Sequence, residues 1–84
     1  MNIVLYSKSN CPNCVAAKQL LQSKGLPCEE REIEVPLWFE TLNMLYPEAR
    51  QMPQIFIDGQ RVGGLAGLQA ALQQLEQHNK EKNT

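Results

Sequence analysis

The sequence predicts an α/β protein with the element order β-α-β-α-β-β-α, in which helices flank a mixed four-stranded sheet. Three observations predict this class. Short apolar runs suited to strands alternate with segments whose apolar residues recur at helical spacing. The dipeptide Asp58-Gly59 joins the last two strand-like runs in a hairpin pattern. The 84 residues, with 43% hydrophobic and 20% charged content, are typical of one domain spanning residues 1–84.

The first half of the chain is expected to form strand, helix and strand. Residues 3–6 are a β-branched and aliphatic run, which predicts a central strand buried on both faces. Residues 12–24 have apolar side chains at helical spacing, with Pro12 suited to the first turn and Gly25 placed to end the helix. In residues 29–35, polar and apolar side chains alternate only at the end of the segment, which predicts a second strand that Pro36 stops.

The next helix is predicted over residues 37–46, where Trp38, Leu42, Leu45 and Tyr46 fall on one face and Pro47 closes the segment. Trp38 and its neighbour Phe39 are interpreted as helix-packing residues, because they follow the helical apolar pattern.

The last part of the chain is expected to form a hairpin and a helix. Residues 54–57 and 60–62 are β-prone runs on either side of Asp58-Gly59, which predicts antiparallel neighbours. Leucines at 65, 68, 72 and 75 then predict an amphipathic helix that ends near His78. Residues 79–84 are expected to be a frayed polar tail.

Charge and apolar patterning exclude several classes of function. A net charge of −1 and the absence of a region rich in Lys and Arg disfavour binding to nucleic acid or to an anionic membrane. The apolar run near the amino terminus is too short for a secretory signal or a membrane span, so a cytoplasmic location is expected. Three cysteines in a reducing compartment indicate a transient, functional disulfide rather than a structural framework.

Cys11 and Cys14 are the candidate reactive pair. They follow the first predicted strand and begin the first predicted helix, where unpaired backbone N–H groups and the helix dipole favour a thiolate. Cys11 is therefore the expected nucleophile. Cys14, one turn into the helix, is expected to be more buried and to resolve a mixed disulfide formed at Cys11. Lys8 adds positive charge nearby.

Other interpretations of the cysteines fit the sequence less well. A zinc site would need Cys28 and His78 to complete four ligands, and His78 falls at the end of the last helix, so no metal is expected. Two cysteines can also be small core residues, but this pair follows a polar loop at a strand end, where α/β sheets place functional groups. Cys28 is interpreted as a packed small residue.

Three segments together resemble the glutaredoxin family over nearly the whole length of the chain. They are the motif at residues 8–14, Lys-Ser-Asn-Cys-Pro-Asn-Cys; the motif at 52–59, Met-Pro-Gln-Ile-Phe-Ile-Asp-Gly; and the double glycine at 63–64. The chain looks like a small dithiol glutaredoxin of the bacterial and bacteriophage type that serves ribonucleotide reductase.

The resemblance implies a thioredoxin-like fold, a monomer, a redox-active Cys11–Cys14 disulfide, and electrons drawn from glutathione as a co-substrate. It also implies that Pro53 is in cis and faces the cysteines. The implied substrates are disulfide-containing proteins, including ribonucleotide reductase, and glutathione mixed disulfides. Carried over position by position, the glutathione site comprises Lys8, Asn13, Gln51, Met52, Pro53, Gly64 and Leu65. Arg50 is a further candidate partner for a carboxylate.

Two departures from the family pattern bear on glutathione. Many relatives have Tyr where this chain has Asn13, and they carry an acidic residue two positions beyond the second glycine, where this chain has Ala66. These departures leave reduction by a thioredoxin-reductase-type flavoprotein open. Two further alternatives are an iron–sulfur-binding module, which Pro12 disfavours, and a scaffold with vestigial cysteines.

Overall fold

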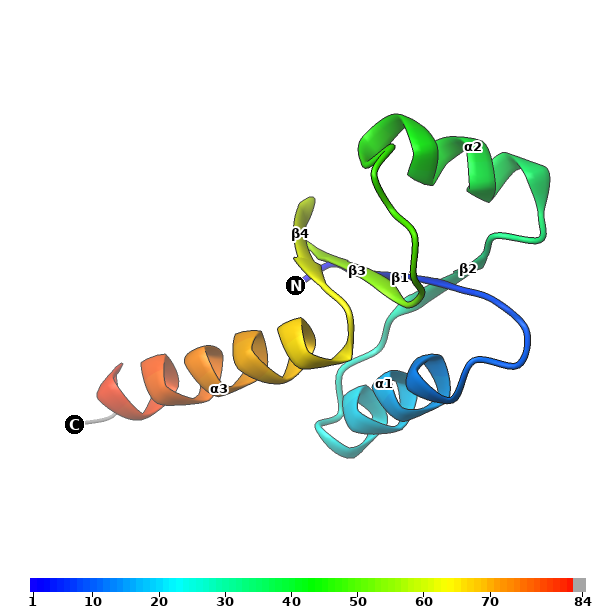
Figure 1. Ribbon diagram of the computed structural model, residues 1–84. Coiled ribbons are helices and arrows are strands. Elements are labelled where there is room, and N and C mark those ends of the chain that lie inside the picture. The colour runs from blue at the N-terminus through cyan, green and yellow to red at the C-terminus, as the bar shows by residue number, and fades with distance from the viewer. Residues whose placement is uncertain (83–84) are drawn as a thin grey trace.

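The computed structural model describes residues 1–82, and the side chains of residues 1–76. The elements follow the predicted order, and Figure 1 labels each of them. The strands are β1 (Ile3–Ser7), β2 (Glu29–Glu32), β3 (Gln54–Ile57) and β4 (Gln60–Gly63). The helices are α1 (Pro12–Ser23), α2 (Pro36–Leu45) and α3 (Leu65–Lys82).

The four strands form one mixed sheet in the order β2-β1-β3-β4. β1 pairs in parallel with β2 and antiparallel with β3. β3 pairs antiparallel with β4, as the hairpin pattern predicted. In the hairpin turn, Asp58 and Gly59 have φ values of +50° and +83°. Positive φ at both positions is typical of the tight turn that matches the twist of antiparallel strands.

The helices lie on opposite faces of the sheet, with α2 on one side and α1 and α3 on the other (Figure 1). The larger core cluster joins β1, β3, α1 and α3 through buried aliphatic side chains such as Leu5, Leu21, Ile55 and Leu68. A smaller aromatic cluster under α2 contains Tyr6, Leu42 and Phe56. Strand β1 contributes to both clusters, which confirms that it is buried on both faces.

The second strand is shorter than predicted. β2 ends at Glu32, because the chain turns there and the Val35 N–H donates to the Glu32 carbonyl 3.0 Å away. Ile33 and Val35, whose alternation suggested the strand, therefore lie outside it. Pro36 does stop the extended segment, and it does so as the first residue of α2.

Two further expectations on the helices were wrong. Leu45 and Phe39 do not pack into the core, because α2 covers the sheet with a single face and leaves them 58% and 55% exposed. Trp38, Leu42 and Tyr46 do pack, as predicted.

Helix α3 continues to Lys82, beyond the end predicted near His78. Of the expected frayed tail at 79–84, the last two residues lie outside the described part of the chain. Within the part described, no helix is long and apolar enough to cross a membrane.

Candidate functional site

The cysteine pair lies where β1 leads into α1, after a loop that is tightly turned. Asn10 has a φ of +54°, a backbone conformation that asparagine tolerates better than most residues. The Ser9 N–H donates to the Glu34 carboxylate at 2.8 Å, and this bond lowers the pKa of Glu34. The loop before Cys11 is thus tied to the segment that follows β2.

Cys11 is the N-cap residue of α1, and Pro12 occupies the first turn. Its Sγ accepts a hydrogen bond from the backbone N–H of Cys14 at 3.2 Å. An N–H donor at a helix start stabilises negative charge, so it favours a thiolate when Cys11 is reduced. Sequence reasoning predicted this placement.

Cys11 and Cys14 form a disulfide, and their Cα atoms are 5.2 Å apart. Cys11 is 7% exposed and Cys14 is 2% exposed, which confirms the predicted order of burial. Cys11 therefore meets an approaching substrate first, and Cys14 lies behind it.

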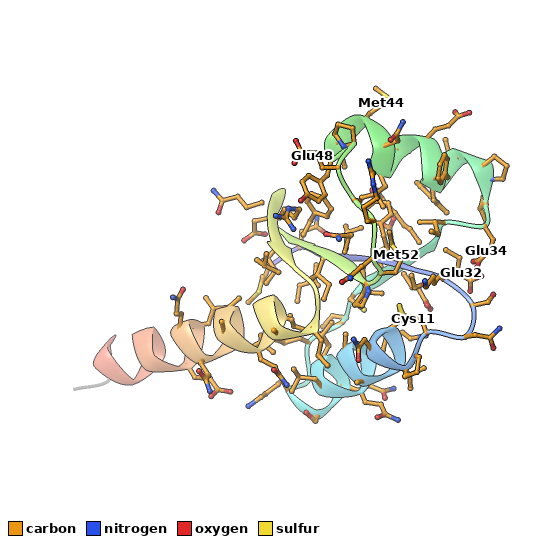
Figure 2. All side chains as sticks on the ribbon, viewed as in Figure 1. Cys11, Glu32, Glu34, Met44, Glu48 and Met52 are labelled. Atoms are coloured by element: carbon orange, nitrogen blue, oxygen red, sulfur yellow. A yellow bond between two sulfur atoms is a disulfide. The ribbon has the colours of Figure 1, made fainter. Side chains whose placement is uncertain are left out.

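The segment before β3 faces the disulfide. The Met52–Pro53 peptide bond is cis, as the resemblance implied. The Met52 carbonyl oxygen lies 3.6 Å from Cys11 Sγ, and Figure 2 shows these two residues near each other on separate parts of the chain. A segment in this position can offer backbone groups to an extended peptide.

A shallow hollow of about 400 Å³, called here the cysteine hollow, lies beside the disulfide. Its lining brings four of the seven residues predicted to bind glutathione together with the nucleophile. The residues that line it are Lys8, Asn10, Cys11, Pro12, Asn13, Gln51 and Met52.

The remaining predicted residues lie outside the cysteine hollow. Gly64 lies beside the Pro53 carbonyl, and an added Cβ would make an ordinary contact with its oxygen at 3.5 Å. The Leu65 side chain packs against the larger core cluster instead of facing the hollow. Arg50 donates to the Pro47 and Ala49 carbonyls of its own loop, at 3.2 Å each.

A polar cluster on α1 and β2 was not predicted from the sequence. The carboxylate of Glu30 accepts hydrogen bonds from Lys18 at 2.9 Å and from the buried Ser7 hydroxyl at 2.8 Å. These bonds lower the pKa of Glu30, with Lys18 the larger cause. Lys18 also lines a second shallow hollow that contains Cys11 and Cys14. The cluster thus places a paired cation beside the disulfide.

Gln54 is a second residue that the sequence analysis missed. Its side chain is buried, donates to the Gln51 carbonyl at 2.9 Å and accepts from Arg61 at 3.3 Å. It therefore holds the loop that carries Met52. A polar residue in an otherwise apolar strand was the signal that would have found it.

Cys28, the third cysteine, is a free thiol that packs half-buried against the larger core cluster. Burial, and secondarily the charge of Glu30, raise its pKa. These features agree with its interpretation as a packed small residue. Among the side chains that the structure describes, no group of three or more His, Cys, Asp or Glu residues is arranged to hold a metal ion.

Comparisons with known proteins agree with this geometry. The glutaredoxin family model matches residues 3–62. Glutaredoxin 3 of Escherichia coli K12 is 38% identical over 69 residues, which cover 82% of this chain and 83% of that protein. Glutaredoxin 1 of Rickettsia bellii is 37% identical over 68 residues, covering 74% of this chain and 67% of the relative.

Solved structures show the same fold. Glutaredoxin 1 from Francisella tularensis, complexed with cacodylate, superposes with a TM-score of 0.73 at 25% identity and covers 90% of this chain and 96% of its own. The glutaredoxin-like NrdH-redoxin from Escherichia coli, described as having a thioredoxin-like activity profile, gives 0.68 at 25% identity, with coverages of 80% and 87%. With its Cys-x-x-Cys disulfide at the start of α1 in a thioredoxin-like fold, the chain belongs to the glutaredoxin family of thiol–disulfide oxidoreductases.

Proposed function

We propose that this protein reduces protein disulfides and glutathione mixed disulfides with electrons from glutathione, using Cys11 as nucleophile and Cys14 as resolving residue. The hydrogen bond from the Cys14 N–H to Cys11 Sγ, at 3.2 Å, is the observation that carries the proposal. It supplies a donor to the sulfur that must carry negative charge.

The reaction divides into three stages. The Cys11 thiolate attacks one sulfur of a substrate disulfide, forms a mixed disulfide and releases the other sulfur as a thiolate. Cys14 then attacks Cys11, closing the Cys11–Cys14 disulfide and releasing the second substrate thiol. Two glutathione molecules reduce this disulfide and leave as oxidised glutathione. On a glutathione mixed disulfide, glutathione can replace Cys14 as the resolving thiol.

The cysteine hollow supports binding of a small thiol-containing peptide beside Cys11. We assign Lys8, whose side chain lines it, to a glutathione carboxylate. Asn13, Gln51 and Met52 line the same hollow and are assigned to contacts with the rest of the tripeptide. Gly64, followed by the free N–H groups of the first turn of α3, is assigned to the γ-glutamyl carboxylate.

Cysteine variants test the nucleophile and the resolving residue separately. Cys11→Ser is expected to abolish reduction of a glutathionylated substrate, and Cys14→Ser to retain monothiol activity because glutathione can resolve the intermediate. The measurement is the rate of glutathione release with glutathione reductase and NADPH present. Full activity in Cys11→Ser would refute the assignment.

The electron donor has a second candidate, a thioredoxin-reductase-type flavoprotein. Two observations favour this donor: the structural likeness to NrdH-redoxin and the lack of an acidic residue at position 66. The test measures the rate at which the Cys11–Cys14 disulfide is reduced by each of two donor systems. One is glutathione with glutathione reductase, and the other is thioredoxin reductase. Faster turnover with the flavoprotein alone would replace glutathione in the proposal. Oxidised ribonucleotide reductase is the first protein substrate to assay with either donor.

A further inference from the structure

Helix α2 exposes an unusual number of large apolar side chains. Leu37, Phe39, Met44 and Leu45 are each more than half exposed, with Met44 at 85%. Figure 2 shows Met44 on the side of α2 that points away from the sheet, whereas Met52 lies beneath the helix near Cys11. Of these four side chains, only Phe39 lines a hollow that extends toward the redox site.

Between α2 and the loop that precedes β3 lies a hollow of about 240 Å³, called here the α2 hollow. Its apolar lining consists of Ile33, Phe39, Leu42, Tyr46, Ala49 and Met52. Cavities that take up whole small molecules are roughly 300–1,000 Å³. The α2 hollow is smaller, which suits it to one large apolar side chain rather than to a tripeptide such as glutathione.

Two cations stand at the rim of this apolar lining. Lys8 and Arg50 both line the α2 hollow, and neither forms an ion pair with a carboxylate among residues 1–76. The nearby Glu34 carboxylate accepts a hydrogen bond from the Ser9 N–H and also interacts with the charge of Lys8. Arg50 is therefore the rim cation best placed to pair with an incoming carboxylate.

The α2 hollow is continuous with the redox site. Lys8 and Met52 line both it and the cysteine hollow, and the Met52 carbonyl is 3.6 Å from Cys11 Sγ. A substrate segment that extends along Met52 advances about 3.3 Å per residue. A side chain one to three residues from the attacked cysteine can then reach the α2 hollow.

We propose that the α2 hollow selects protein substrates, by binding one large apolar side chain that lies within three residues of the attacked cysteine and is accompanied by a carboxylate. The inference rests on the proposed function, since it specifies the substrate of the same cysteine pair. The carboxylate pairs with Arg50, because Lys8 is assigned to glutathione, and the apolar side chain fills the hollow against Phe39 and Met52.

A peptide scan tests this selection. Each peptide carries one cysteine, joined to glutathione as a mixed disulfide, in an Ala/Ser host. A single Phe is moved through the three positions on either side of the cysteine, and kcat/KM for reduction is measured. Burial of a side chain of this size predicts a gain of about tenfold or more at one position over the unsubstituted host. Replacing an adjacent Ser by Glu is expected to add a gain that disappears at high salt.

Two neighbouring exposed positions on α2 offer a matched pair of variants. Asn43 lines the α2 hollow, whereas Met44 points away from it. The quantity compared is the selectivity ratio, which is kcat/KM for the best Phe peptide divided by kcat/KM for the host peptide. Asn43→Trp is expected to fill the hollow and to bring this ratio close to one. Met44→Trp introduces the same side chain next door and is expected to keep the wild-type ratio. Phe39→Ala, which removes one wall, provides a second variant and should also lower the ratio.

Each outcome has a distinct meaning. If the wild-type protein reduces neither host nor Phe peptides, both the proposed function and the docking inference fail. If it reduces all peptides equally well, or if the ratio survives in Asn43→Trp and Phe39→Ala, the docking inference alone fails. A wild-type dimer that Asn43→Trp converts to a monomer, measured by light scattering, would show that a second copy covers the hollow, and would also overturn the inference.

Discussion

Gly67 is expected to be irreplaceable, although it lies in a helix where alanine is ordinarily preferred. Replacing an interior helical glycine by alanine generally stabilises a helix by about 1 kcal/mol. Here, a Cβ added at Gly67 would lie 1.8 Å from the Val62 carbonyl oxygen and 2.9 Å from its carbon. The first turn of α3 therefore crosses the end of β4 at backbone-to-backbone distance.

The size of the effect follows from which atoms must move. Carbon and oxygen atoms in contact are normally about 3.3–3.6 Å apart, so the strand and the helix would have to separate by roughly 1.5 Å. The atom in the way is a backbone oxygen of β4, and the residues on either side of Val62, Arg61 and Gly63, are both paired with β3, which limits how far it can move. Overpacking of this kind costs about 1–3 kcal/mol, and we expect Gly67→Ala to lose about 2–3 kcal/mol of unfolding free energy.

Thermal unfolding of the oxidised protein, followed by far-ultraviolet circular dichroism, measures this loss. For a domain of this size, it corresponds to a fall in Tm of about 10–20 °C. Gly64→Ser is the matched control, because its Cβ would make an ordinary 3.5 Å contact and serine suits the position before a helix. A Gly67→Ala protein as stable as the wild type would refute the close crossing of α3 and β4.

Three other predictions concern polar groups and the third cysteine. Hydrogen bonds from Lys18 and Ser7 lower the pKa of Glu30, so this group stabilises the fold above its unfolded pKa of about 4.3 and loses that contribution as pH falls through its lower folded pKa. The Tm of Glu30→Gln should therefore fall less than that of the wild type between pH 5 and pH 3, and parallel curves would contradict this. Gln54→Leu leaves the Gln51 carbonyl without its donor and should cost about 1–3 kcal/mol in urea unfolding; an unchanged midpoint would argue against the contact. Because burial raises the pKa of Cys28, iodoacetamide should modify it in the reduced protein only at alkaline pH, and rapid labelling at pH 6 by mass spectrometry would disagree.

Local patterns were sufficient for most of the secondary structure. The Asp58-Gly59 turn, Pro12 at a helix start and the leucine spacing of α3 each act through the bonding of nearby backbone. The predicted secondary structure was wrong where the conformation of a segment depends on its contacts with distant parts of the chain. The apolar residues Ile33 and Val35 suggested more strand, but the chain turns there to bring α2 over the sheet.

The site divides in the same way. The sequence alone determined that Cys11 begins a helix and that Cys14 lies behind it, because the spacing of two cysteines around a helix start fixes both. The resemblance to the glutaredoxins already implied that the Met52–Pro53 segment faces the cysteines. Only the tertiary structure decided that Gln54 and Glu34 hold the surrounding loops and that Phe39 borders an apolar hollow. The physical reason is that these contacts join segments far apart in the chain, and their geometry depends on how the sheet and helices pack.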